Sequence, residues 1–165
     1  MQHPLTVTVN GDVHELYVDA SISLLQFVRQ HLGLTGSKEG CDDSECGACM
    51  MLVDGSPVNS CSYLALQANG RMVTTVEGLA RGAELHPLQR QFAELGGVQC
   101  GYCTSGMLMS AAALLKKTPR PTEEEIRWAL SGNLCRCTGY TKIVRAVEAA
   151  AAEMQTSSRG ARKRG

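Results

Sequence analysis

The chain has 165 residues, a formal net charge of zero and 44% hydrophobic residues, but only 4% of it is aromatic. This length suits one domain or two small ones, with a core built mainly from aliphatic side chains. Because acidic and basic residues balance, the composition gives no reason to expect a nucleic acid or an anionic membrane surface as a partner.

The first residues have the alternating pattern of a β-hairpin. LTVTV (5–9) and HELYVD (14–19) alternate apolar and polar positions on either side of Asn10-Gly11-Asp12, a strong tight-turn signal. The start of the chain shows none of the segments of a signal peptide, and no apolar run approaches the ~20 residues that span a bilayer. We therefore expect a cytoplasmic protein without a membrane span.

Apolar spacing then predicts a helix followed by further strands. ISLLQFVRQHL (22–32) places apolar residues on one helical face, with Asp19 or Ser21 as the N-cap. MMLVDG (50–55) is typical of a strand that ends in an Asp-Gly turn, and SPVNSCSYLA is expected to return beside it. RMVTTVEGL (71–79) predicts another short strand and the exit from it.

From about residue 80 the strand pattern gives way to helical spacing. Helices are predicted at residues 85–95, 104–117, 122–131 and 140–154. Pro87 suits a first helical turn, and Thr122 with the acidic residues after it forms a capping-box pattern. The chain is therefore predicted to be α+β, with a strand-rich domain over 1–79, a four-helix domain over 80–155 and a flexible basic tail over 156–165.

All eight cysteines fall into two groups of four, one in each half of the chain. The first quartet is Cys41, Cys46, Cys49 and Cys61, and the second quartet is Cys100, Cys103, Cys135 and Cys137. Disulfides rarely persist in a reducing compartment, so these thiols indicate metal ligation or redox chemistry rather than covalent cross-links.

The first quartet has the spacing C-x4-C-x2-C with one more distant cysteine, which is that of plant-type ferredoxins with a [2Fe–2S] cluster. Gly40, Gly47 and Ala48 lie beside these cysteines and would let backbone N–H groups approach a cluster. Structural zinc sites made of four cysteines more often use two closely spaced cysteine pairs. The first quartet therefore favours iron–sulfur over zinc.

The second quartet, C-x2-C followed by C-x-C, is ambiguous on its own. It is compatible with zinc, with a [2Fe–2S] cluster or with a redox-active dithiol. Cys100 and Cys103 precede the helix predicted from Thr104, and Cys135 and Cys137 lie between the last two predicted helices. Helix N-termini and loop amides at these places would stabilise an anionic cluster.

Taken together, GCDDSECGAC, VNSC, VQCGYC and NLCRCTGY make the chain resemble the small iron–sulfur subunit of the molybdenum hydroxylases. This is the family of xanthine dehydrogenase, aldehyde oxidoreductase and carbon monoxide dehydrogenase, and the resemblance covers about residues 4–155. It implies an N-terminal β-grasp ferredoxin-like domain with one [2Fe–2S] cluster, followed by a four-helix domain with a second [2Fe–2S] cluster.

The resemblance also implies partners. In the family, electrons pass one at a time from molybdopterin in a large subunit, through both clusters, to FAD in a medium subunit. The expected assembly is a heterotrimer or a dimer of heterotrimers. The second quartet would lie nearer to the molybdenum, with Gln99 and Cys137 against the molybdopterin of the partner chain, and this chain would contain no catalytic residue.

Two departures from the family pattern stand beside the quartets. The family often has a proline where CGYCTSG places Ser105, which leaves the start of the following helix open. It often has Thr-Val where Met50 and Met51 follow Cys49, which changes the packing beside the first cluster. Neither departure replaces a cysteine.

The remaining polar residues indicate no second chemistry. The four histidines lack metal-ligand spacing, and no phosphate-binding glycine loop is present. Asp42, Asp43 and Glu45 are interpreted as solvated charges on the rim of the first loop. Two alternatives remain open on these residues: a free-standing two-cluster ferredoxin, and a zinc-binding interaction module with purely structural quartets.

Overall fold

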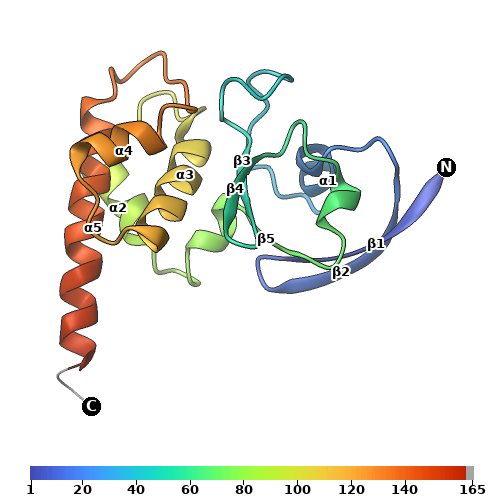
Figure 1. Ribbon diagram of the computed structural model, residues 1–165, viewed down its shortest axis with the longest axis horizontal. Coiled ribbons are helices and arrows are strands. Elements are labelled where there is room, and N and C mark those ends of the chain that lie inside the picture. Colours follow the sequence, from blue (N-terminus) through green and yellow to red (C-terminus); the bar gives the residue numbers. More distant parts are fainter. Residues whose placement is uncertain (163–165) are drawn as a thin grey trace.

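The computed structural model describes the backbone of residues 1–162 and the side chains of residues 1–156. Within them, a β-sheet with one helix is followed by a group of four helices (Figure 1). The strands are β1 Gln2–Val9, β2 Asp12–Asp19, β3 Met50–Val53, β4 Ser56–Asn59 and β5 Met72–Thr74. The helices are α1 Leu24–Gln30, α2 Pro87–Glu94, α3 Thr104–Lys117, α4 Glu123–Ala129 and α5 Thr141–Arg162, with the short 3-10 helices η1 Ala65–Ala68 and η2 Val76–Leu79. The predicted α+β class is confirmed.

The five strands form one sheet in the order β2-β1-β5-β3-β4. β1 runs parallel to β5, and the other neighbouring strands are antiparallel. The predicted hairpin between β1 and β2 is confirmed, with Asn10 at φ 53° and Gly11 at φ 100° in its turn. Positive φ at both positions is what a tight hairpin turn that follows the twist of the strands requires. This mixed sheet is the β-grasp arrangement.

Helix α1 begins after Ser23, which is its N-cap in place of the predicted Asp19 or Ser21. The Ser23 hydroxyl accepts a hydrogen bond from the Gln26 amide at 3.1 Å, and the Gln26 side chain accepts one from the Ser23 amide at 3.2 Å. Asp19 instead accepts hydrogen bonds from the amide and the hydroxyl of Ser21. The cap prediction is wrong because these two residues close a turn of their own before the helix starts.

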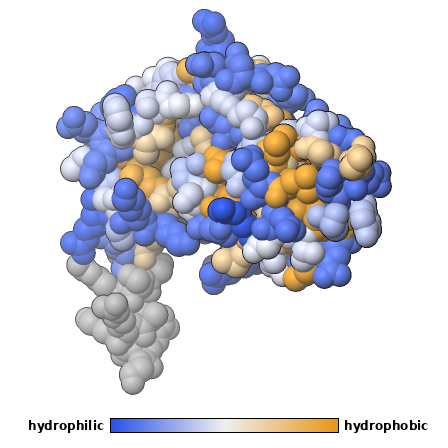
Figure 2. Space-filling view, turned by 45° about the vertical axis from the view of Figure 1, so that its right-hand side comes forward, coloured by the Kyte–Doolittle hydropathy of each residue, from blue (hydrophilic) through white to orange (hydrophobic). Residues whose placement is uncertain are grey.

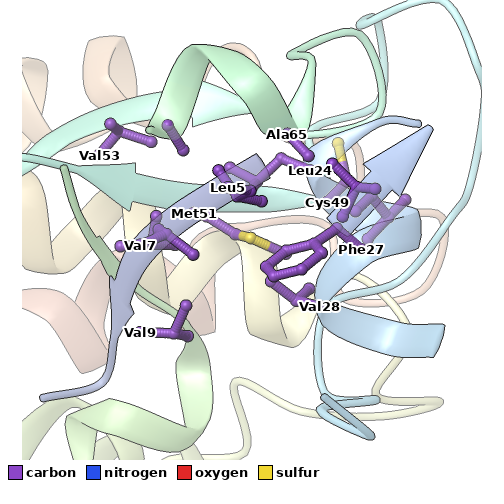
Figure 3. Close-up of a cluster of buried hydrophobic side chains, with 14 of the residues drawn as sticks. Leu5, Val7, Val9, Leu24, Phe27, Val28, Cys49, Met51, Val53 and Ala65 are labelled. Carbon is purple, nitrogen blue, oxygen red and sulfur yellow. The ribbon is translucent and has the colours of Figure 1, made fainter. Parts of the chain in front are cut away.

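The buried face of α1 closes the first hydrophobic core against the sheet. Figure 3 shows Leu24 and Phe27 of this helix among side chains of β1 and β3. Met51, one of the departures from the family pattern, is fully buried in this core. Cys49 belongs to the same core, so packed hydrocarbon holds one thiol of the first quartet in place.

The chain after β4 departs from the prediction in one place. The helix η1 was not predicted, whereas the short strand and exit expected over 71–79 are present as β5, which divides from η2 after Thr74. At the division, the Asn10 side chain accepts a hydrogen bond from the Thr75 amide and donates one to the Thr75 hydroxyl, both at 2.9 Å. The backbone there bonds a side chain instead of a neighbouring strand, so the strand ends.

The four predicted helices of the second half are present, and they enclose a second core between them. Pro87 lies in the first turn of α2, and Thr122 with Glu125 forms the predicted capping box of α4. Helix α5 continues to Arg162 rather than ending near residue 154. The last three residues of the predicted tail, 163–165, lie outside the described part of the chain.

Two glycines allow α3 to contact the loop that precedes β3. A Cβ atom on Gly106 of α3 would lie 2.0 Å from the Gly47 carbonyl oxygen. A Cβ atom on Gly47, whose φ is +70°, would lie 2.3 Å from the Gly132 carbonyl oxygen. Because backbone atoms cannot rotate away as a side chain can, both positions require glycine. The loop of the first quartet is therefore held between α3 and the residues that follow α4.

The described surface is mixed in character. On the face shown in Figure 2, hydrophobic residues form separate spots among hydrophilic ones. None of the helices within residues 1–162 is both long and apolar enough to cross a bilayer.

Replacing Gly106 with Ala should lower the free energy of unfolding by about 1–3 kcal/mol, because the new methyl group displaces backbone. Urea denaturation followed by circular dichroism measures this loss. Gly132→Ala is the matched control, since a Cβ atom there meets nothing within 4 Å. Equal losses in the two variants would contradict the close contact at Gly106.

His86 makes the stability of the second half depend on pH. Its Nδ1 accepts a hydrogen bond from the Leu88 amide at 3.2 Å and caps α2. Burial, and then the positive charge of Arg81, lower the pKa of His86. An unfolded histidine binds a proton near pH 6.5, and folded His86 binds it only at lower pH. The contribution of His86 to the free energy of unfolding is therefore complete above about pH 6.5 and is lost as the pH falls below that value.

Between about pH 7.5 and about pH 5.5, the free energy of unfolding should fall more for the natural chain than for His86→Asn. The asparagine keeps a side-chain cap but does not titrate. Urea denaturation at the two pH values gives the comparison. An identical decrease in both proteins would show that His86 is protonated equally well in the folded and the unfolded chain.

Candidate metal centres

The first quartet lies on the loop between α1 and β3 and just after β4. Strand pairing places Met50 opposite Asn59, so Cys49, immediately before β3, comes beside Cys61, two residues after β4. The Ser60 hydroxyl fastens this junction by donating a hydrogen bond to the Cys49 carbonyl oxygen at 2.6 Å. The sequence folds locally as a hairpin, and the hairpin brings the distant fourth cysteine of the motif to the loop.

Within the first quartet the thiols form two pairs. The amide of Cys46 donates a hydrogen bond to the Cys41 sulfur at 3.4 Å. The hydrogen bond from the Asp43 amide, followed by that from Cys46, lowers the pKa of Cys41, whereas burial raises the pKa of Cys46. Burial raises the pKa of Cys49 to about 11, with the Cys61 amide hydrogen-bonded to its sulfur.

The second quartet is assembled from the loops at the two ends of the α3–α4 segment. Cys103 is the residue before α3, with Cys100 three residues earlier, and Cys135 and Cys137 lie between α4 and α5. Here too the thiols pair across the loops, Cys103 with Cys135 and Cys100 with Cys137. Figure 1 shows these loops and the loop before β3 at the same end of the molecule.

Burial and hydrogen bonds set different pKa values in the second quartet. Burial raises the pKa of Cys103 to about 12. Burial also acts to raise the pKa of Cys135, but hydrogen bonds from the hydroxyl and the amide of Thr138 outweigh it and lower the pKa. A shared hydrogen bond with Cys100 raises the pKa of Cys137. Bound metal would deprotonate these thiols, as it does for coordinating thiols in general.

The pairing of the thiols fits a two-iron cluster better than a single ion. A four-cysteine zinc site needs all four sulfurs at about 2.3 Å from one ion, whereas four thiolates of a [2Fe–2S] cluster divide over two irons. A Cβ atom on Gly40 would lie 2.9 Å from the Cys46 sulfur, so the loop needs glycine to wrap closely around its thiols.

The two quartets differ in exposure. Cys49 and Cys61 are buried, whereas Cys100 and Cys137 are exposed. Gln99 is exposed immediately beside Cys100. Asp42, Asp43 and Glu45 are exposed on the rim of the first loop, as expected for solvated charges.

Several side chains near the quartets were not singled out from the sequence. Tyr140 accepts a hydrogen bond from the Cys135 amide on its hydroxyl at 2.8 Å, and Thr138 contacts the Cys135 sulfur at 3.1 Å. Tyr102 donates a hydrogen bond from its hydroxyl to the Glu39 carbonyl oxygen at 2.6 Å. The only signal for them was their position between cysteines or within three residues after one, which does not reveal a hydrogen bond.

Ser105 contacts the first loop instead of disturbing the helix start. Helix α3 begins at Thr104 as predicted, and the buried Ser105 hydroxyl donates a hydrogen bond to the Ala48 carbonyl oxygen at 3.3 Å. Where the family often has a proline, this chain therefore has a hydrogen bond between its two halves.

A β-grasp domain and a four-helix domain, each with four clustered thiols, define an iron–sulfur protein with two cluster-binding domains. Comparisons with known families agree. Residues 7–78 match the 2Fe-2S iron-sulfur cluster binding domain, and residues 75–148 match the [2Fe-2S] binding domain.

Individual relatives are similar over nearly the whole chain. The nicotinate dehydrogenase small FeS subunit of Eubacterium barkeri is 48% identical over 143 residues, which are 87% of this chain and 91% of that protein. The nicotine 6-hydroxylase small subunit of Paenarthrobacter nicotinovorans is 52% identical over 143 residues, 87% of this chain and 86% of that one. The crystal structure of quinoline 2-oxidoreductase from Pseudomonas putida 86 superposes with a TM-score of 0.90 at 42% identity, covering 94% of this chain and 97% of the other.

The chain belongs to the small [2Fe–2S] iron–sulfur subunits of the molybdenum hydroxylases. It is the electron-transfer subunit of an oxidoreductase complex and has two [2Fe–2S]-binding domains. The resemblance predicted from the cysteine motifs is confirmed.

Replacing Cys135 with Ser should remove one of two distinguishable electron paramagnetic resonance signals of the reduced protein and half of its iron, because only the second quartet loses a thiolate. The signal of the cluster in the first quartet should remain, since that quartet lies in the other half of the chain. Iron analysis and spectra of the natural chain are the reference. Loss of both signals together would show that the two quartets do not hold independent clusters.

Proposed function

We propose that the eight cysteines are the ligands of the two clusters, and that electrons enter at the second quartet and leave from the first. The observation that supports entry at the second quartet is the exposure of Cys100 and Cys137, whereas Cys49 and Cys61 of the first quartet are buried and Cys41 and Cys46 are half-buried. Electron transfer from a partner needs a cluster close to the contact surface, and the second quartet meets that need.

The surface around the second quartet suits contact with a large molybdopterin-binding subunit. Gln99 is exposed next to Cys100, and Cys137, the thiol that pairs with Cys100, is exposed as well. Both would lie against the molybdopterin. The apolar side chains of Val98, Tyr102 and Leu134, which are 37%, 49% and 56% exposed, adjoin the same cysteines in the sequence. Apolar exposure of this kind marks surfaces that partners cover.

A medium FAD-binding subunit completes the proposed complex, as a heterotrimer or a dimer of heterotrimers. A relative described as the small subunit of a nicotine 6-hydroxylase supports an assembly with larger chains.

When bound, each [2Fe–2S] cluster accepts and releases one electron. The residues of this chain hold the clusters and present the second at the surface. The use of all eight cysteines as ligands supports a cytoplasmic location, where a reducing environment keeps thiols available.

Gln99→Ala should weaken retention of the large subunit while leaving both clusters in place, because Gln99 is exposed and is not a thiol. Affinity purification of the tagged chain from its native host, followed by native mass spectrometry and iron analysis, measures both effects. Gln30→Ala, at an exposed position at the end of α1, is the control and should retain the partner fully.

The same purification decides between the proposed complex and a free-standing ferredoxin. The complex requires that a molybdopterin-containing chain and a flavin-containing chain copurify with the natural protein in fixed ratio. A natural chain that carries both clusters but retains no partner would favour the ferredoxin. Unaltered retention by Gln99→Ala would place the molybdopterin contact elsewhere on the surface.

A further inference from the structure

The helical half binds three consecutive carbonyl groups of the first loop. The Leu134 amide donates a hydrogen bond to the Cys46 carbonyl oxygen at 2.9 Å. The Asn133 side-chain amide donates to the Gly47 carbonyl oxygen at 3.0 Å. The Ser105 hydroxyl donates to the Ala48 carbonyl oxygen at 3.3 Å. Each carbonyl from the second cysteine of the motif to the residue before the third thus accepts a hydrogen bond from the other half of the chain. Those of Gly47 and Ala48 also accept one from the amides of Met50 and Lys38, at 3.2 Å each.

The orientation of these carbonyls also orients the amides that follow them. A trans peptide group is planar, with its C=O and its N–H pointing in opposite directions. With the carbonyls of residues 46–48 bonded to the helical half, the amides of residues 47–49 point away from it. On that side the Ala48 amide donates a hydrogen bond to the Cys46 sulfur.

Asn133 is the central and most deeply buried of the three donor residues. Its side chain is only 2% exposed, and its oxygen accepts a hydrogen bond from the Ser110 hydroxyl of α3 at 2.7 Å. That bond leaves the Asn133 side-chain nitrogen directed at Gly47, so the orientation of the amide group is determined from inside the helical core. Gly47 itself has no room for a side chain at this contact.

We propose that Asn133, held by Ser110, is a positioning residue for the cluster of the first quartet. From the opposite domain it orients the amides of residues 47–49 toward the thiolates and so raises the reduction potential of that cluster. Hydrogen bonds to the sulfurs are among the factors that set the potential of a [2Fe–2S] cluster, because they stabilise its more negative reduced state. The inference rests on the proposed assignment of the first quartet as ligands.

Asn133→Ala in the full chain carrying both clusters should lower the equilibrium constant for reduction of the first cluster by about three- to tenfold. This is the size of effect expected for the loss of one hydrogen bond. For a one-electron couple this corresponds to a fall of about 30 to 59 mV. Redox titration followed by electron paramagnetic resonance reads the two clusters separately. The second cluster should keep its potential, although Asn133 is much nearer to Cys135 in the sequence. Hydrogen exchange of the amides of residues 47–49 should become faster in the same variant.

Two further variants control this experiment. Ser110→Ala leaves Asn133 in place but removes the bond that orients it, so it should shift the first cluster in the same direction by a smaller factor, and it decides the matter if Asn133→Ala does not fold. Thr122→Ala removes the N-cap of α4, which weakens the helical half by about 1 kcal/mol without touching the loop. It should change neither potential.

The outcomes separate the inference from the ligand assignment. An unchanged first potential in both Asn133→Ala and Ser110→Ala overturns the positioning role, as do equal shifts of the two clusters or a shift in Thr122→Ala. Absence of two distinguishable clusters in the natural chain overturns the ligand assignment and the inference together.

Discussion

The contact between the Gly47 loop and the helical half is the constraint on which the arrangement of both thiol quartets depends. A helix and a loop can approach this closely only where neither has a side chain, and Gly106 and Gly47 meet that condition. Because α3 begins directly after Cys103, its position also determines the position of the second quartet. A shift of this helix would therefore move one quartet and release the other. Two domains with separate cores are thus joined at the loop that carries the first quartet.

Polar contacts reinforce this junction from several elements. The hydroxyl groups of Ser105 and Tyr102 reach from the segment around Cys103 to carbonyl oxygens on either side of Cys41 and Cys46. Asn133 reaches the same loop from the other end of the helical segment. Each donor meets a backbone carbonyl, which any sequence provides, so the loop can remain short and rich in small residues. The cost of burying these polar groups is offset because each has a partner.

The local elements and the chemistry of the quartets could be predicted from the sequence, whereas the contacts between the halves could not. Strand alternation, the Asn10-Gly11 turn and the capping box at Thr122 are encoded by neighbouring residues, so the hairpin and α4 were predicted correctly. The N-cap of α1 was predicted wrongly, because Asp19, Ser21 and Ser23 are all good caps and the turn formed by the first two decides among them. Gly106 resembles an ordinary weak point of a helix in the sequence. Only the position of Gly47, 59 residues earlier in the numbering, explains it.

The pairing of thiols favours one of the kinds of metal site that spacing alone left open. By its spacing alone, the second quartet was compatible with a zinc site as well as with an iron–sulfur cluster. In the fold, Cys103 meets Cys135 and Cys100 meets Cys137, so each loop contributes one thiol to each pair. A cluster with two irons needs two such pairs side by side, and both loops must then be in place before either iron has its ligands. With the quartets as the ligands, as proposed, binding of the second cluster is coupled to the packing of α3, α4 and α5, in the same way that the first is coupled to the β3–β4 hairpin. Since α3 also touches the Gly47 loop, packing of the helical core supports both sites.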